Sequence, residues 1–225
     1  MSEALPQLRR ILLPSLQPCK EFSAVCSSHC RWEPGGGHIP RGYMGARGDL
    51  SEINLVFVVS EPAEPGDGEI YCGSPEEMFS SYYNYAYAAL KELNMTRNGN
   101  EQPFHSKFRK ILDIFIPETS FEDQMRKVWI TDSVLCSAKK SGAVVDEDVE
   151  KACAHLYLRP QRILLSGAFW VALGNKAKNR MDKCGLAYDA KALHPSASDK
   201  YDPSTSWSRA AKKYHDWAAV GGDQS

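Results

Sequence analysis

The sequence lacks a marked excess of charge of either sign, and it lacks long apolar runs. Its 225 residues include 27 Lys and Arg against 28 Asp and Glu, a formal net charge of −1. This balance excludes a uniformly basic coat for nucleic acid, but it leaves room for a local basic groove. No apolar run reaches membrane-spanning length. The first apolar stretch has only three residues before Pro14, so we expect no secretory signal.

The sequence also has no internal repeat and no low-complexity tract. Its hydrophobic fraction of 43% is enough for a sizeable core and argues against wholesale disorder. A chain of 225 residues suits one compact domain or two small ones. We expect a single domain over residues 1–225, with residues 1–50 as an N-terminal extension.

The seven cysteines are an odd number in a chain without an export signal. This disfavours a disulfide framework and favours metal binding or buried thiols. Composition alone slightly favours buried thiols, because free cysteine is among the most buried residue types. Three cysteines lie near the start, two lie in mid-chain seventeen positions apart, and two are isolated: Cys19, Cys26 and Cys30; Cys136 and Cys153; Cys72 and Cys184.

Four short apolar runs predict buried strands, at residues 54–59, 128–130, 162–166 and 190–194. Each run is continuous rather than alternating, which is typical of a parallel sheet covered on both faces. The segments between and after them predict helices, at residues 75–93, 146–158, 169–177 and 204–220. This alternation predicts a three-layer α/β/α sandwich with a central four-stranded parallel sheet.

Polar residues follow the predicted strands where an open α/β sheet binds its ligands, beyond the carboxyl ends of the strands. Glu61 and Glu64 lie in a Pro/Gly loop after the first strand, Asp132 ends the second, and His194 and Ser196 follow the fourth. Carboxylates can position a water or stabilise a cation, and a histidine can donate one directed hydrogen bond. Taken singly, the loop carboxylates and His194 are better explained as solvated or structural residues.

Taken together, the order of these segments resembles the uracil-DNA glycosylase superfamily, closest to its iron–sulfur bacterial and archaeal branches, families 4 and 5. The resemblance covers roughly residues 26–200. It implies a cytoplasmic, nucleoid-associated bacterial enzyme, monomeric, that excises uracil from DNA in base-excision repair. Four segments carry it: VVSEPAEPG, VWITDSVLCSAKK, VEKACAHLYLRPQRILLSGAFWVALG and the final HPS.

The resemblance also implies a 4Fe–4S cluster held by four thiolates, the usual ligands of such clusters. Cys136 and Cys153 match the second pair of the family, and Cys26 and Cys30 are the expected first pair. Their C-x₃-C spacing departs from the C-x₂-C of the family, so Cys19 is a possible substitute. The cluster would be structural, tying the N-terminal segment to the edge of the sheet.

A zinc site is the competing metal interpretation. It would combine these thiols with His29 or His38, since zinc accepts both sulfur and imidazole ligands.

The resemblance assigns the catalytic roles to two residues. Glu61 would stabilise the oxocarbenium-like sugar or position a water, and His194 would donate a hydrogen bond to the departing uracil. Glu64 is the alternative carboxylate, because the loop is two residues longer than the family motif. Backbone groups at Pro62 and Ala63 are expected to contact the base.

The flipped base needs an aromatic platform, since stacking contributes strongly to binding. Phe79 matches the position of the family's stacking residue, and Tyr83, one helical turn later, is the runner-up. Asp132 is the main departure, because the family usually has asparagine there. An ionised aspartate accepts from uracil N3–H but cannot donate to O4; it can donate only if burial keeps it protonated.

Contacts to the DNA backbone are expected from the HPS loop and from basic loop residues. The candidates are Ser196, Arg41, Arg47, Lys139 and Lys140.

No lysine stands out at a strand end, which argues against lyase chemistry because that reaction needs an amine nucleophile. The sequence also has no counterpart of the Lys-Arg-Arg-Ile-His insertion of the covalent-trapping branch. Two alternatives stay open: a glycosylase for another deaminated base such as hypoxanthine or xanthine, and a non-catalytic iron–sulfur protein that binds damaged DNA.

Overall fold

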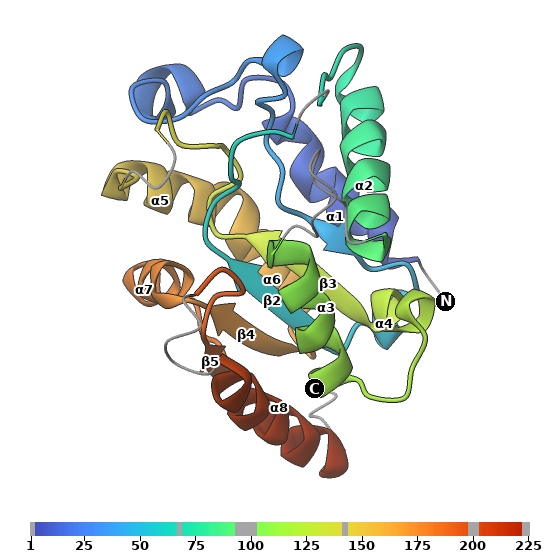
Figure 1. Cartoon of the computed structure of the whole chain (residues 1–225). Helices are drawn as coiled ribbons and strands as arrows, with labels where there is room; N and C mark the ends of the chain where they lie inside the picture. The colour runs from blue at the N-terminus through green and yellow to red at the C-terminus, as the bar shows by residue number, and fades with distance from the viewer. Residues whose placement is uncertain (1–2, 67–68, 93–102, 141–143, 198–202, 222–225) are drawn as a thin grey trace.

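Five strands of the described chain form one sheet, with helices packed on both of its faces (Figure 1). The computed structural model describes residues 3–66, 69–92, 103–140, 144–197 and 203–221. The strands are β1 (Met44–Gly45), β2 (Leu55–Val59), β3 (Val128–Asp132), β4 (Phe169–Leu173) and β5 (Ala190–Ala192). The helices are α1 (Ala4–Leu12), α2 (Pro75–Lys91), α3 (Pro103–Phe115), α4 (Phe121–Lys127), α5 (Glu147–Cys153), α6 (Arg159–Leu164), α7 (Asn175–Lys183) and α8 (Pro203–Ala219).

The sheet is mixed, with the strand order β1-β3-β2-β4-β5. Strands β3, β2, β4 and β5 run parallel to one another, and β1 pairs antiparallel with β3. The prediction of an α/β fold is confirmed, but a purely parallel four-stranded sheet is wrong. The added strand comes from the glycine-rich loop: Gly45 has a φ of +100°, and a Cβ there would lie 2.2 Å from the Val128 carbonyl oxygen. Only glycine permits this approach.

The predicted strands at 54–59, 128–130 and 190–194 are confirmed as β2, β3 and β5. The strand predicted at 162–166 is wrong, because that segment lies in and just after α6, and the strand is Phe169–Leu173, where a helix was predicted. Two short apolar runs flank Ser166 and Gly167, and periodicity cannot decide between such runs. All five residues of β4 are buried between its neighbours, whereas Ile163 is 70% exposed.

Large aromatic side chains join the two faces of the sheet to their helices. On one face, the Phe57 ring packs edge-on against Phe108 and Phe115 of α3, and α8 lies beside α3 (Figure 1). On the other face, Trp129 Nε1–H donates to Gln161 of α6 at 2.7 Å, and Trp170 donates to a backbone carbonyl. Both indole donors are thus satisfied inside the core, as burial requires.

The helices predicted at 75–93, 146–158 and 204–220 are confirmed as α2, α5 with the π-helical turn Ala154–Leu158, and α8. Helix α2 begins with a capping box, in which Ser74 and Glu77 bond to each other's backbone N–H. Helices α1, α3 and α4 were not predicted, and only residues 175–177 of α7 fall within the helix predicted at 169–177. Within the segments that the structure describes, no helix is both long and apolar enough to cross a membrane.

Candidate functional site

A cavity of about 340 Å³ opens at the carboxyl ends of β2 and β3, and we call it the strand-end pocket. It lies where parallel-sheet proteins bind ligands. Its walls come from the segment that leads into β1, from the loops after β2 and β5, and from α2 and the start of α3. Described lining residues include Gly42, Ser60, Glu61, Pro62, Ala63, Glu64, Glu69, Tyr82, Phe104, His105, Asp132, His194 and Ser196.

Glu61 lies two residues beyond the end of β2, and its side chain is 9% exposed. Lys176 of α7 contacts Oε1, and Arg180 Nη1 lies 2.6 Å from Oε2. The hydrogens on that nitrogen go elsewhere, to the Ser60 carbonyl oxygen at 2.9 Å and to Ser133 Oγ at 3.2 Å. Oε2 is buried and accepts no hydrogen bond within the described residues. Oε2 therefore has the Arg180 charge beside it and is shielded from solvent by the protein.

Arg180 connects the pocket to a helix on the far side. Its Nε donates to Glu150 Oε1 of α5 at 2.8 Å, and its side chain is 4% exposed. The guanidinium thus bridges two acidic side chains, Glu61 and Glu150, from inside the protein. Such a planar fork suits arginine better than lysine.

Asp132 ends β3 at the floor of the pocket and is 6% exposed. Burial, and next the charge of Glu61, raise the pKa of the Asp132 carboxyl well above its usual range, against the opposing charges of Arg180 and Arg41. The carboxyl makes no hydrogen bond to another described side chain, and a Cβ at Gly42 would lie 1.9 Å from its Oδ2. A protonated carboxyl offers one donor and one acceptor, as an asparagine amide does.

His194 follows β5, and its ring is held in one tautomer. The Ser196 backbone N–H donates to His194 Nδ1 at 3.0 Å, so the ring proton of neutral His194 lies on Nε2. Burial lowers the pKa of His194, which favours the neutral ring. The Phe104 ring centroid lies 6.0 Å from that of His194. The arrangement supplies a neutral N–H donor at the pocket.

Glu64 lies at the rim of the pocket rather than inside it. It pairs with Arg31 at 3.2 Å and lies 3.6 Å from His38, and its side chain is 44% exposed. The more buried carboxylate of this loop is Glu69, which was not predicted. Its Oε2 pairs with Arg41 at 3.1 Å, and both side chains are 6% exposed.

The predicted base platform lies outside the pocket. Phe79 is 2% exposed and stacks between Tyr43 and Tyr83, with centroid distances of 5.1 and 5.9 Å. Tyr83 is also buried, and its hydroxyl donates to the Gly45 carbonyl oxygen. Neither ring offers a face to the strand-end pocket in this arrangement, because both belong to the packing of α2.

The aromatic residues that do line the pocket include Phe104 and Tyr82, and His105 lies next to Phe104. Phe104 and His105 were not predicted as site residues, because no helix was predicted at 103–115. The signal was present, since Phe104, Phe108, Ile111 and Phe115 recur at helical spacing.

The predicted DNA contacts fall in different places. Ser196 lines the pocket. Arg41 does too, but it is only 5% exposed and donates to Ala63, Glu69 and Ser137. Its guanidinium therefore anchors the loop that contains Pro62 and Ala63 instead of facing solvent.

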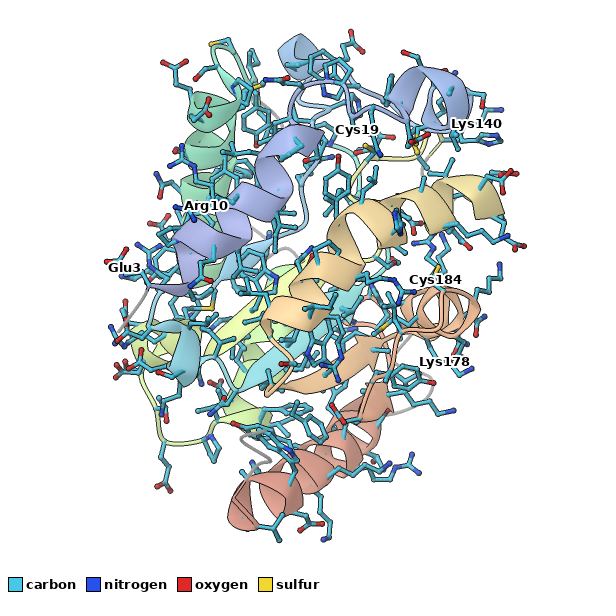
Figure 2. All side chains as sticks on the ribbon, turned by 180° about the vertical axis from the view of Figure 1, so that it is seen from behind. Glu3, Arg10, Cys19, Lys140, Lys178 and Cys184 are labelled. Atoms are coloured by element: carbon cyan, nitrogen blue, oxygen red, sulfur yellow. The ribbon has the colours of Figure 1, made fainter. Side chains whose placement is uncertain are left out.

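Arg47 lies at the other end of β3 from Asp132, because antiparallel β1 leads away from the pocket. Its guanidinium lies 4.0 Å from the Tyr87 ring centroid. Lys139 and Lys140 are exposed near the N-terminal cysteines, since the Lys139 N–H donates to the His29 carbonyl oxygen. Figure 2 labels Lys140 at the same end of the molecule as Cys19.

Four cysteines, from three separate segments, line a second, largely apolar cavity of about 20 Å³, which we call the cysteine cavity. They are Cys19, Cys26, Cys136 and Cys153. Cys30 does not line the cavity, but it is 1% exposed and packs in the same cluster as Cys26 and Cys136. Three of the four predicted ligands, Cys26, Cys136 and Cys153, thus line the cavity. Cys19 is the fourth cysteine that lines it.

The thiols of this group match the ligands of an iron–sulfur cluster in number and kind, because such clusters are held by soft sulfur donors. The cavity between them, at about 20 Å³, has room for about one water. Burial raises the pKa of Cys153 to about 12 and that of Cys30 to about 11. A hydrogen bond from Cys26 lowers the pKa of Cys19. Among the described residues, no three His, Cys, Asp or Glu side chains form a group that could hold a metal ion.

The two remaining cysteines lie apart from this group. Cys72 is exposed, and Cys184 follows α7 (Figure 2). All seven cysteines are free thiols in the structure.

The strand-end pocket therefore combines a carboxylate beside two cations, a buried carboxyl with a raised pKa and a neutral histidine donor. In comparisons with known proteins, the chain matches no family model and no curated protein.

Proposed function

We propose that this protein is a monofunctional DNA glycosylase that flips uracil out of DNA and hydrolyses its N-glycosidic bond. The observation that carries the proposal is the meeting of Glu61, Asp132 and His194 around one cavity at the carboxyl edge of the sheet. A flipped base must be read along its polar edge, held by its flat face and stabilised as it leaves. The pocket has a residue for each task.

Glu61 acts on the sugar side of the reaction. As the bond breaks, the deoxyribose gains oxocarbenium character and attracts negative charge or a positioned water. Glu61 lines the pocket and supplies this negative charge, with its Oε2 atom shielded from solvent by the protein. Arg180 and Lys176 fix the carboxylate in place.

His194 acts on the leaving base. Its Nε2–H is aimed by the Ser196 N–H bond to Nδ1, and it donates to the uracil oxygen on which negative charge develops. A neutral donor is suited to this role because it does not have to lose a proton.

Asp132 reads the base, and Phe104 supports its face. A protonated Asp132 accepts from uracil N3–H and donates to O4, the pattern an asparagine amide would provide. The same edge occurs in hypoxanthine and xanthine, which makes a glycosylase for one of these bases the second candidate. Phe104 takes the stacking role in place of Phe79, because its ring lines the pocket.

We further propose that the cysteine cavity holds a structural 4Fe–4S cluster. Cys26, Cys136 and Cys153 are three ligands, and Cys30 or Cys19 is the fourth. When bound, the cluster would supply a rigid link between the N-terminal segment and the end of β3. No step of the base excision depends on it.

The experiment is an excision assay with single- and double-stranded oligonucleotides that carry one uracil, hypoxanthine or xanthine, followed by alkaline cleavage of abasic sites. Breaks at uracil support the proposal, and breaks only at another base support the second candidate. Glu61→Gln and His194→Ala should each lower the rate by about 10²–10³-fold. Glu64→Gln is the matched control and should stay near wild type. Binding without any breaks would contradict a catalytic role.

A further inference from the structure

A third cavity, of about 360 Å³, lies between α7, β5 and α8, and we call it the basic cavity. Its described lining is cationic or neutral, with no acidic residue: Gly174, Asn175, Lys178, Lys191, Ala192, Leu193, Ser206, Arg209, Ala210 and Lys213. None of these residues belongs to the strand-end pocket or to the predicted DNA contacts. Figure 1 shows the three elements side by side, and Figure 2 labels Lys178 on α7.

The fold brings four cations together from separate parts of the chain. Arg209 and Lys213 are four residues apart on α8 and therefore share one helix face. Lys191 is the exposed middle residue of β5, and Lys178 lies on α7. Small residues, Ala192 and Ala210, line the space between them.

Within the described residues, three of these four cations have no acidic side chain at ion-pair distance. Lys178 pairs with Asp182 at 2.5 Å, and the charge of Asp182 also acts on Lys191. Arg209 donates to the Thr205 carbonyl oxygen, whereas Lys191 and Lys213 make no hydrogen bond or ion pair within the described residues. Like charges around one cavity raise the local potential, and an anionic ligand lowers that energy.

Two consecutive residues of one turn line the basic cavity and the strand-end pocket. Leu193 lines the basic cavity and His194 lines the pocket. The Gly174 backbone packs closely against the same turn, since a Cβ on Gly174 would lie 3.0 Å from His194 Cβ. The Leu193 N–H donates to Ser206 Oγ of α8 at 3.0 Å, which fixes the turn between the two cavities.

We infer that the basic cavity binds phosphates of the DNA strand that carries the flipped nucleotide. The inference rests on the proposed function, because it takes DNA as the substrate. A nucleotide held at His194 brings its neighbouring phosphates to the far side of the same turn. Flexible cations on an open surface suit repeated phosphates, which are bound through charge and need no base reading.

The test compares Lys191→Gln, Arg209→Gln, Lys213→Gln and the triple variant with wild type. Lys212→Gln is the matched control, because Lys212 lies on the same helix but pairs with Asp216 at 2.8 Å. The probe is a uracil oligonucleotide duplex, with binding measured by fluorescence anisotropy at several salt concentrations. Each cavity variant should weaken binding and reduce the slope of log K against log salt by about one. Single-turnover excision at saturating enzyme should be unchanged.

Two arms separate this inference from the proposed function. If wild type excises uracil and the triple variant keeps the affinity and salt slope of Lys212→Gln, the phosphate subsite is overturned. If wild type excises nothing but the triple variant still loses DNA affinity, the subsite is supported and the proposed function fails. If inorganic phosphate raises the melting temperature of wild type but not of the triple variant, while DNA affinity is equal, the cavity binds small phosphates and the inference is overturned.

Discussion

Arg180 Nη1 lies 2.6 Å from Glu61 Oε2, yet the hydrogens of that nitrogen are donated to Ser60 and Ser133. The guanidinium therefore stabilises the negative charge of the carboxylate and also holds two neighbouring serines in place. Its other end bonds to Glu150 of α5. A single buried cation thus fixes the carboxylate of the pocket relative to the helix that carries Cys153.

The first prediction concerns the stability that Arg180 provides. Arg180→Met leaves Glu61 with Lys176 and Glu150 with Lys183 as their remaining cations, and both lysines are partly exposed. Loss of the buried partner should lower the free energy of unfolding by about 3 kcal/mol. Lys183→Met is the control, because Lys183 also contacts Glu150 but its side chain is 47% exposed, and it should cost less than about 1 kcal/mol. Urea denaturation measures both. Adding Glu150→Leu to Arg180→Met should recover part of the loss, and equal losses in Arg180→Met and Lys183→Met would contradict the account.

The second prediction is that Asp132 destabilises the fold as pH rises. In the folded protein the pKa of Asp132 is raised above its ordinary value of 3.8. Its contribution to the free energy of unfolding is therefore fully present below the ordinary pKa and is lost as pH rises through the folded pKa. The groups that face it are Glu61, Arg180, Arg41 and the Tyr82 hydroxyl. Asp132→Asn cannot ionise, and its stability relative to wild type should therefore increase with pH.

Thermal or urea unfolding of wild type and Asp132→Asn, from about pH 4 to about pH 8, measures this difference. In the excision assay, Asp132→Asn should keep its activity at alkaline pH, whereas the wild-type rate should fall there. Parallel stability curves for the two proteins would show that Asp132 is ionised throughout.

The third prediction separates Phe104 from Phe79. Phe104→Ala should weaken binding of the flipped base by about 1–3 kcal/mol, the usual contribution of one stacked ring. Phe79→Ala should instead destabilise the fold by about 3–5 kcal/mol, because Phe79 is a fully buried ring. DNA affinity and urea unfolding are measured for both variants. If Phe104→Ala keeps the wild-type DNA affinity and Phe79→Ala folds but loses DNA affinity, Phe79 is the residue on which the base stacks.

The fourth prediction concerns the cysteine cavity. Anaerobically purified protein should contain about four irons and absorb in the visible range, and Cys136→Ser or Cys153→Ser should abolish both signals. Cys19→Ser and Cys30→Ser identify the fourth ligand, since only one of them should bleach the protein. Cys72→Ser and Cys184→Ser are the controls and should stay coloured. Colourless wild-type protein that retains its fold would refute the cluster, and zinc in its place would be found by metal analysis.

The sequence was sufficient to find the edge of the sheet where the pocket lies. Continuous apolar runs predicted β2, β3 and β5, and the residues after them include Glu61, Asp132 and His194. This works because parallel strands end at a common edge, so the residues that follow them meet in space. The short antiparallel β1 was missed because two residues of strand leave no periodic signal.

The rest depends on long-range packing that no local pattern records. Arg180 lies on α7, and its partners Glu61 and Glu150 are far away in the chain. Phe79 and Phe104 are both aromatic residues in helices, and only tertiary structure decides which ring lines the pocket. Either of the apolar runs beside Ser166 could have formed a strand. In the structure it is the second run, β4, that pairs with β2.

The most direct test of the proposed function is detection of the released base. Wild-type protein is incubated with a uracil-containing oligonucleotide, and the small-molecule fraction is analysed by mass spectrometry. We predict free uracil in amounts equal to the abasic sites formed, with release strongly reduced in Glu61→Gln and His194→Ala and unchanged in Glu64→Gln. No free base from wild-type protein that is folded and binds the oligonucleotide would contradict the account.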